Sequence, residues 1–324
     1  MRRILVYEYL SAGGPVDGEA QAAELLPQGV AMRDAVVADL LGVPGVALTV
    51  AACDRPGAGV PQAAARAAVG VATAGAGEPP ATFVRRAARG HDLVWVIAPE
   101  TDGLLARLHD AVGAQRWIGC TADAIRLASS KAATLQALAQ RRVPTPLAFD
   151  GERVGGWVVK PDDGAGALDG RVHATRAAAE ADLHQRRRAG RSATLEPFVQ
   201  GQALSLSLLA GPGFVQPLAC NRQRVAIEAD GVLAYRGVEV GAVDLRTDPR
   251  AVRLHTVALD VARAVPGLRG YVGVDLVWHA AHGPVVIEIN PRVTCSYVGL
   301  SDALGRNVAG EIVLLHDLPE PADA

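Results

Sequence analysis

The chain has 324 residues, of which half are hydrophobic and a fifth are charged, and its formal net charge is −2. This length is sufficient for two or three compact domains, and the apolar fraction excludes an intrinsically disordered chain. A charge balance so close to neutral provides no basic surface for a nucleic-acid backbone or an anionic membrane, so we expect neither as a partner.

The cysteines and the hydropathy of the chain indicate a soluble protein of the cytoplasm. Cys53, Cys120, Cys220 and Cys295 are scattered without C-x-x-C spacing, which favours reduced thiols over a disulfide framework or a zinc site. Glu8 interrupts the first apolar run, so we interpret this run as a strand and not as a signal segment. No apolar run reaches the about 18 residues that a membrane span requires.

The N-terminal part of the chain predicts an open α/β domain. Strand and helix patterns alternate there in the order that is typical of a parallel sheet. A stretch rich in alanine, glycine and proline, residues 57–80, predicts a loop with a short helix. The predicted strands and helices are strand 3–9, helix 36–41, strand 46–52, helix 82–89 and strand 93–98.

The remainder of the chain predicts a mixed α+β region. It opens with a helical pattern and ends with an amphipathic helix followed by a hairpin. We expect three domains, with bounds 1–120, 121–199 and 200–324. The predicted elements before the hairpin are helix 121–142, strand 157–160, helix 176–188, strands 194–199, 204–209, 215–219 and 232–240, and helix 254–265.

Two lysines stand out in a chain that otherwise uses arginine. Lys131 follows two serines at an expected helix start, where backbone amides favour anions. Lys160 ends a strand that continues into the sequence PDDGAGALDG, whose glycines allow the backbone to fold closely over an anion. This combination predicts a phosphate site that matches neither a Walker A loop nor G-x-G-x-x-G. A glycine-rich hairpin turn without a ligand is the alternative.

The sequence YVGVDLVW-HAAHGP-VVIEINPR predicts a hairpin with acidic residues on one face. Pairing of Trp278 with Val285 would place Asp275 opposite Glu288, and period two adds Asn290 to the same face. Opposed carboxylates repel unless a cation or a proton lies between them, and oxygen ligands of this type suit Mg²⁺ or Mn²⁺. A solvated polar face, or a carboxylate that holds Arg292, is the alternative.

These motifs resemble the ATP-grasp superfamily of carboxylate–amine ligases. They occur in that family's order over roughly residues 100–305, and the N-terminal region resembles the Rossmann-like domain that precedes an ATP-grasp fold. The motifs are the two lysines, the loop DDGAGA, the strand LEPFVQG, Asp275 and the sequence EINPR.

The resemblance implies a clamp of two α+β subdomains around ATP, with Asp163, Gly164, Ala165 and Gly166 in a lid over the phosphates. Lys131 and Lys160 would contact the phosphates. It implies that Mg²⁺ or Mn²⁺ binds to Asp275, Glu288 and Asn290, and that Arg292 lies near the reacting phosphate. The adenine would lie against Glu196, Pro197, Phe198 and Val199, with Gln202 in place of the family's usual ribose-binding glutamate.

The chain also contains the sequences YEYLSAGG, GQALSLSLL, ACNRQ, YRGVEVG and NPRVTCSYVGL. These sequences resemble, more narrowly, the branch of the superfamily that contains tyramine–L-glutamate ligase. This branch implies an enzyme that joins L-glutamate to tyramine, tyrosine or a related amine, in biosynthesis of a methanofuran- or methylofuran-type one-carbon carrier. Arg222 and Arg236 are candidate carboxylate clamps, or else members of ordinary ion pairs. Tyr297 is the candidate for the acceptor pocket. By analogy with other members of the superfamily, the resemblance further implies a homodimer.

Two other functions share the nucleotide site. An ATP-dependent phosphotransferase would release a stable phosphorylated product and would need no amine. A non-catalytic ATP sensor would need no complete metal set, so the presence of Asp275, Glu288, Asn290 and Arg292 together with both lysines argues against it.

Overall fold

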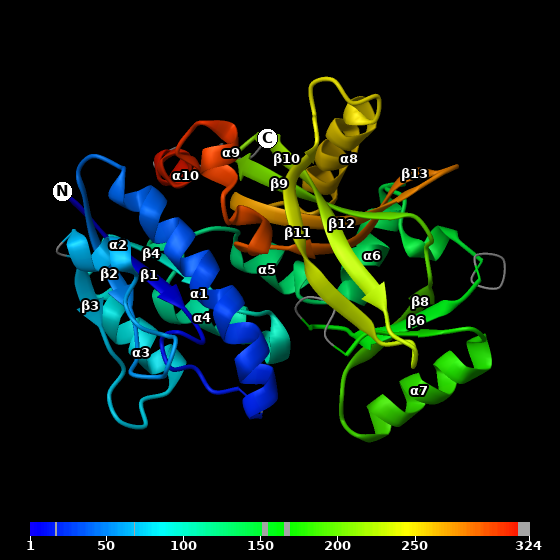
Figure 1. Ribbon diagram of the computed structural model, residues 1–324, viewed down its shortest axis with the longest axis horizontal. Helices are drawn as coiled ribbons and strands as arrows, with labels where there is room; N and C mark the ends of the chain where they lie inside the picture. Colours follow the sequence, from blue (N-terminus) through cyan, green and yellow to red (C-terminus); the bar gives the residue numbers. More distant parts are fainter. Residues whose placement is uncertain (17, 68, 151–154, 165–168, 317–324) are drawn as a thin grey trace.

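Three β-sheets follow one another along the chain in the computed structural model, which describes residues 1–16, 18–67, 69–150, 155–164 and 169–316 (Figure 1). The first sheet is wholly parallel and the other two are antiparallel. This change of sheet type matches the expected passage from an α/β region to a mixed α+β region.

The N-terminal sheet has the strand order β3-β2-β1-β4-β5. Its central strands are almost fully buried, which explains their near-continuous apolar sequences. The N-terminal elements are β1 Arg2–Glu8, α1 Glu19–Leu41, β2 Val46–Ala51, α2 Gln62–Arg66, β3 Gly70–Ala72, α3 Pro80–Ala88, β4 Leu93–Ile97, α4 Leu104–Val112 and β5 Trp117–Ile118.

Two helices, α5 (Ala122–Ala128) and α6 (Lys131–Gln140), replace the single helix expected over 121–142. The break falls at the two serines, because Ser130 adopts an extended conformation and its hydroxyl caps the second helix by accepting a hydrogen bond from the Ala133 N–H at 3.2 Å. Lys131 is therefore the first residue of α6, as its position after two serines predicts.

A small sheet of three strands, ordered β7-β6-β8, follows α6. One helix, α7, covers it, with Ala179 and Leu183 packed against Trp157 and Val159. The bounds of these elements are β6 Trp157–Pro161, β7 Arg171–His173, α7 Arg176–Arg188 and β8 Ala193–Pro197.

The C-terminal sheet has the order β11-β10-β9-β12-β13. Helix α8 packs on one of its faces through the apolar stripe that its period predicts, including Leu254, Val257 and Val261. The bounds are β9 Gln202–Gly211, β10 Phe214–Ile227, β11 Leu233–Val243, α8 Ala251–Ala264, β12 Gly270–His279, β13 Gly283–Asn290, α9 Leu300–Leu304 and α10 Val308–His316.

The acidic hairpin of β12 and β13 has the predicted pairing at its centre and a different one at its end. Asp275 lies opposite Glu288, as expected, but Leu276 pairs with Val286, so Ile287 is an extra residue in β13. This bulge shifts the register by one residue, and Trp278 consequently pairs with Pro284, so the predicted pairing with Val285 is wrong.

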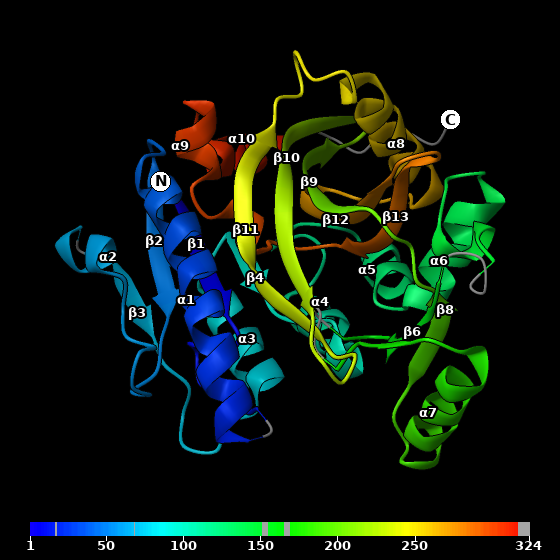
Figure 2. The ribbon, with the colours of Figure 1, turned by 45° about the vertical axis from the view of Figure 1, so that its right-hand side comes forward.

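The turn of the β10–β11 hairpin joins the C-terminal sheet to the small sheet. Val172 N donates to Gly231 O and Leu233 N donates to Gly170 O, both at 2.8 Å. In Figure 2 this long hairpin extends from the C-terminal sheet toward β6. The backbone that follows the glycine-rich loop is thus held by the sheet that carries the acidic residues.

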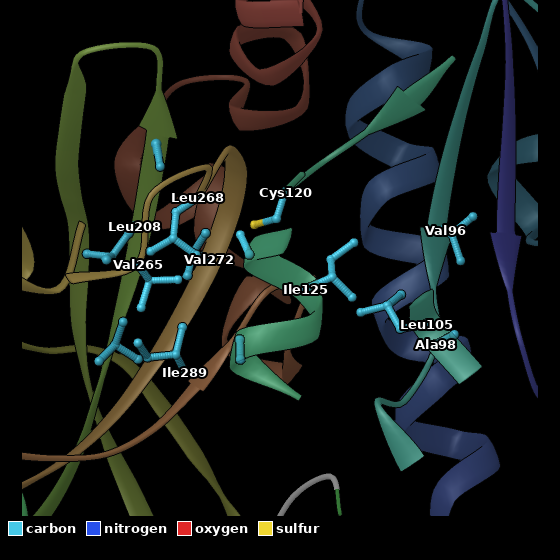
Figure 3. Packing of buried hydrophobic residues seen from close by; sticks show 14 of the residues in the cluster. Val96, Ala98, Leu105, Cys120, Ile125, Leu208, Val265, Leu268, Val272 and Ile289 are labelled. Carbon is cyan, nitrogen blue, oxygen red and sulfur yellow. The ribbon is translucent and has the colours of Figure 1, made fainter. Parts of the chain in front are cut away.

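One apolar core crosses from the N-terminal sheet to the C-terminal sheet. Figure 3 shows Ile125 of α5 between Val96 of β4 on one side and Val272 of β12 on the other, with Cys120 close by. At the C-terminal end, α10 packs against α1 and β12. Within the described ranges, no helix is both long enough and apolar enough to cross a membrane.

Gly267 provides a test of the junction between the N-terminal and C-terminal parts. Its φ is +86°, its carbonyl accepts a hydrogen bond from Thr121 N at 2.9 Å, and a Cβ at this position would overlap the Thr121 side chain that caps α5. We expect Gly267→Ala to lower the free energy of unfolding by the left-handed penalty of about 1 kcal/mol plus about 1 to 3 kcal/mol from the overlap.

Gly190→Ala is the matched control, because Gly190 has a φ of +73° and no atom within 4 Å of an added Cβ. Denaturant unfolding should show the larger loss for the Gly267 variant. Equal losses in both variants would mean that the contact with Thr121 is without consequence.

Candidate active site

Contacts among charged side chains join residues from all three parts of the chain. Lys131 of α6 reaches Glu288 of β13, and Glu100, which follows β4, reaches Arg292, which follows β13. These side chains are all largely buried, so their charges interact strongly.

Asp275 and Glu288 are neighbours across the β12–β13 pair. Gln223 Nε2 donates to Asp275 Oδ1 at 2.8 Å, and Asn290 Nδ2 donates to Asp275 Oδ2 at 3.2 Å. Burial, with the nearby negative charge of Glu288, raises the pKa of Asp275 to about 7. The charged form of Asp275 is therefore disfavoured in its buried position beside Glu288.

Lys131 lies within a group of carboxylates. Its Nζ is 3.1 Å from Glu288 Oε1, and it also donates to the Gly164 carbonyl. Burial alone would lower the pKa of Lys131, but the carboxylates of Glu288, Glu100 and Glu196 raise it above its usual value. A fixed ammonium group therefore stands between the acidic strand and the start of the glycine-rich loop.

The first turn of α6 is occupied by a carboxylate of the protein itself. Asp162 Oδ1 accepts from Ala132 N at 2.8 Å, Asp162 Oδ2 accepts from the Ser130 hydroxyl at 2.7 Å, and Asp162 O accepts from Lys131 N at 2.9 Å. The expected anion at this helix start is therefore Asp162, which ties the end of β6 to α6 and fixes Lys131 and Lys160 near each other in the fold.

Lys160 forms a buried ion pair with Glu196, with Nζ 2.6 Å from Oε1. Both residues lie on the same face of the small sheet, because Val158 pairs with Glu196 and Lys160 with Thr194. The other oxygen, Glu196 Oε2, is buried and has no hydrogen-bond partner among the described residues. A donor group of a bound ligand would satisfy it.

The predicted lid is described only in part. Asp163 Oδ2 accepts a hydrogen bond from Asp102 N at 2.8 Å, and Gly164 O accepts from Lys131. Ala165 and Gly166 lie outside the described residues.

Arg292 is held by Glu100 of the N-terminal part. Its NH2 donates to Glu100 Oε2 at 3.0 Å, its NH1 donates to Val293 O at 3.0 Å, and its Nε lies 2.9 Å from Glu100 Oε1 without hydrogen-bond geometry. Only 9% of the Arg292 side chain and 5% of the Glu100 side chain are exposed. This pair makes the N-terminal domain a direct neighbour of the acidic hairpin.

The residues Asp275, Glu288 and Asn290 fit a divalent cation. Two adjacent carboxylates and an amide side chain provide the hard oxygen donors that Mg²⁺ and Mn²⁺ prefer. A cation would favour the charged form of Asp275, whose pKa is raised by burial and by repulsion from Glu288. Within the described ranges no three His, Cys, Asp or Glu side chains gather as a metal site, which is consistent with a set of only two carboxylates.

Several predicted ligand contacts have protein partners instead. Arg222 pairs with Glu239 at 3.4 Å and Arg236 pairs with Glu228, all partly exposed on the β10–β11 hairpin, so these arginines form the ion pairs that were the alternative to substrate clamps.

Tyr297 and Gln202 are also engaged. Tyr297 is 1% exposed and its hydroxyl donates to Asp39 Oδ2 of α1 at 2.6 Å, so the structure places it in the core and not in an open acceptor pocket. The side-chain oxygen of Gln202 accepts from Arg250 NH1 at 2.7 Å, which takes up the group expected to contact a ribose.

Sequence reasoning missed three residues that organise the site, namely Glu100, Asp162 and Gln223. Glu100 follows the carboxyl end of a parallel strand, where ligand sites of α/β sheets lie, and this signal was available. Asp162 follows Lys160 closely in the loop. Nothing in the sequence pairs Gln223 with Asp275, because this contact depends on how β9 separates β10 from β12.

Two family models match the chain. A model described as an ATP-grasp domain matches residues 128–296, which is more than half of the chain, and a model described as a pre ATP-grasp 3 domain matches residues 48–125.

In sequence, the chain is similar to a tyramine–L-glutamate ligase of Methanocaldococcus jannaschii, with 28% identity over 211 residues. This match covers 64% of the chain and 58% of that ligase, so the chain spans less than two thirds of its relative's length.

Solved structures share the fold over nearly the whole chain. A putative ATP-grasp superfamily protein from Archaeoglobus fulgidus has a TM-score of 0.69 and 22% identity over 97% of this chain and 88% of its own. An L-amino acid ligase from Bacillus licheniformis has a TM-score of 0.66 and 17% identity over 99% of this chain and 76% of its own.

The raised pKa of Asp275 predicts how stability depends on pH. A folded-state pKa of about 7, against about 3.9 in the unfolded chain, means that the unfolded state releases a proton that the folded state keeps, so this group stabilises less as pH rises to 7. We therefore expect Asp275→Asn, in protein freed of metal by a chelator, to gain stability relative to the wild type between pH 5 and pH 8.

Urea unfolding at both pH values measures this difference. Asp260→Asn, which removes an exposed carboxylate of α8 paired with Arg263, is the control and should show no such trend. If the Asp275 variant followed the wild type in parallel across this pH range, the carboxyl group would not titrate there.

Proposed function

Because the chain belongs to the ATP-grasp family, we propose that it is an ATP-dependent carboxylate–amine ligase that forms an amide through an acyl phosphate. The observation that carries this proposal is the contact between Lys131, a candidate phosphate ligand, and Glu288, a candidate metal ligand, at 3.1 Å. Groups that bind phosphate and groups that bind its cation must be neighbours in a site that transfers a phosphoryl group.

In this proposal ATP lies between the small sheet and the C-terminal sheet. Lys131 and Lys160 hold the phosphates, and the loop that starts with Asp163 and Gly164 is the proposed lid. The adenine lies against Glu196, Pro197, Phe198 and Val199. Its amino group would donate to the unpaired Glu196 Oε2. Gln202 remains the candidate for ribose binding. Its side-chain oxygen would first have to give up its hydrogen bond with Arg250.

The reaction proceeds in two displacements. An oxygen of the substrate carboxylate attacks the γ-phosphorus of ATP, the bond to the bridging oxygen breaks, and ADP leaves from an acyl phosphate. An amine nitrogen then attacks the acyl carbon, inorganic phosphate leaves and the nitrogen loses a proton. Lys131, Lys160 and Arg292 stabilise the negative charge that develops on the phosphoryl oxygens.

Asp275, Glu288 and Asn290 would hold Mg²⁺ or Mn²⁺, which neutralises charge on the phosphate oxygens when bound. Gln223 holds one oxygen of Asp275 in place, as residues around metal ligands commonly do, and the amide nitrogen of Asn290 donates to the other.

We propose L-glutamate as the acid and tyramine, tyrosine or a related amine as the acceptor, in biosynthesis of a one-carbon carrier of the methanofuran or methylofuran type. This choice is supported by the name of the 28% identical relative. With small molecules as substrates, the ligase needs no nucleic acid or membrane, and we place it in the cytoplasm. A homodimer is part of the proposal on family grounds alone.

ADP release by the purified protein tests the proposed function. We expect ADP from Mg²⁺-ATP to depend on both L-glutamate and an amine, and the product to weigh one water less than their sum. ADP with the acid alone, together with a stable phosphorylated product, would indicate a phosphotransferase. ATP binding without turnover for any acid and amine would favour a sensor.

Replacement of Glu288 tests the metal assignment. Because Glu288→Gln removes a charged ligand while it keeps the shape of the side chain, we expect kcat for ADP release to fall by about 100-fold or more. Glu311→Gln is the control for the loss of one ion pair, because Glu311 of α10 forms a partly exposed pair with Arg306. Unchanged turnover in a folded Glu288 variant would remove this residue from the metal site.

A further inference from the structure

The loop after β4 connects the N-terminal domain to two parts of the proposed ATP site. Glu100 holds Arg292, and Asp102 N donates to Asp163 Oδ2 at 2.8 Å, at the start of the glycine-rich loop. The loop residues Asp102 and Gly103 both have positive φ, 52° and 66°, which turns the chain sharply toward these partners. Asp102 tolerates this conformation better than most residues with a side chain.

The contacts of Arg292 leave one edge of its guanidinium open. A guanidinium has five N–H donors. Glu100 covers the edge formed by Nε and NH2, and Val293 O takes one N–H of NH1. Within the described part of the chain, NH1 and NH2 each make one hydrogen bond to the protein, so each terminal nitrogen keeps one N–H that can donate to a carboxylate or phosphate.

Stability alone is a poor explanation for the Glu100–Arg292 pair. Burial of two charges costs solvation free energy that their attraction roughly offsets, so a buried pair is weak evidence for a stabilising role. The two residues are 192 positions apart and follow strands of different sheets, and Glu100 also contributes to the raised pKa of Lys131. The pair therefore fixes the orientation of a positive group beside the proposed reacting centre.

We propose that Glu100 is a positioning residue of the ligase, and that it holds Arg292 so that the remaining N–H groups of the guanidinium face the reacting carboxyl or phosphoryl group. The inference rests on the proposed function. Both carboxylate oxygens of Glu100 lie next to Arg292, so in this proposal Glu100 acts on the site through Arg292. The N-terminal domain thereby supplies a part of the active site from outside the ATP-grasp match at residues 128–296.

The test is a double-mutant cycle on ADP release with Mg²⁺-ATP, L-glutamate and tyramine. In Glu100→Gln, Arg292 loses its counter-charge and its fixed orientation, and we expect kcat to fall about 10- to 100-fold with little change in the KM for ATP. In an Arg292→Gln background the same substitution should lower kcat no further, because Glu100 acts only through Arg292.

Glu78→Gln is the matched control. Glu78 also holds an arginine, Arg86, through both carboxylate oxygens in the N-terminal domain, but away from the site, and kcat should stay within twofold of the wild type. Wild-type turnover decides the proposed function separately, since an absence of ADP release with every acid and amine tested would refute the ligase before any variant is compared.

Two results would overturn the inference. One is a double variant whose kcat is reduced by the product of the two single-variant reductions. The other is a folded Glu100→Gln protein with the wild-type kcat. If Glu100→Gln does not fold, Glu100→Asp keeps the charge opposite Arg292 and shortens the side chain by one methylene group. We expect this variant to melt near the wild type with kcat reduced several-fold, and a wild-type kcat here would likewise overturn the positioning role.

Discussion

Two carboxylates placed side by side on neighbouring strands are the constraint around which the site is arranged. The register of β12 and β13 sets Asp275 opposite Glu288, where each raises the free energy of the other's charged form. Strand pairing cannot relieve this repulsion. Positive charge and hydrogen-bond donors must come from other elements. Lys131 of α6 provides the positive charge next to Glu288, and Gln223 of β10 donates a hydrogen bond to Asp275.

The same requirement explains why distant segments meet at this hairpin. Lys131 reaches Glu288 because Asp162 anchors the first turn of α6 to the end of β6, and the β10–β11 turn binds the backbone that follows the glycine-rich loop. The small sheet is thus fixed to the C-terminal sheet at two places, of which the contact through Lys131 is with an acidic strand. Lys160 pairs with Glu196 within the small sheet, whereas Lys131 pairs with Glu288 of the C-terminal sheet, so the carboxylate partners of the two lysines lie in different sheets.

The N-terminal domain takes part in the site because its core is continuous with that of the C-terminal sheet. Ile125 and Cys120 pack between β4 and β12 (Figure 3), which brings the carboxyl end of β4 close to the acidic hairpin. Ligand sites in parallel sheets lie at such strand ends. Here the strand end delivers Glu100 to Arg292, so the α/β domain is joined to the ATP-grasp fold through charge as well as through apolar packing.

Local patterns were sufficient for much of the fold and for the central residues of the site. Period-two alternation placed Asp275, Glu288 and Asn290 on one face, and the serines before Lys131 marked a helix start, because side-chain direction and capping depend on near neighbours in the chain. Two features required packing between segments far apart, namely the core position of Tyr297 against Asp39 and the contact of Glu100 with Arg292. Two others depended on the register of strand pairs, namely the bulge at Ile287 and the ion pairs of Arg222 and Arg236 within the β10–β11 hairpin. In an arginine-rich chain, charge alone does not identify the partner of a given arginine, since the tertiary fold chooses which carboxylate comes within reach.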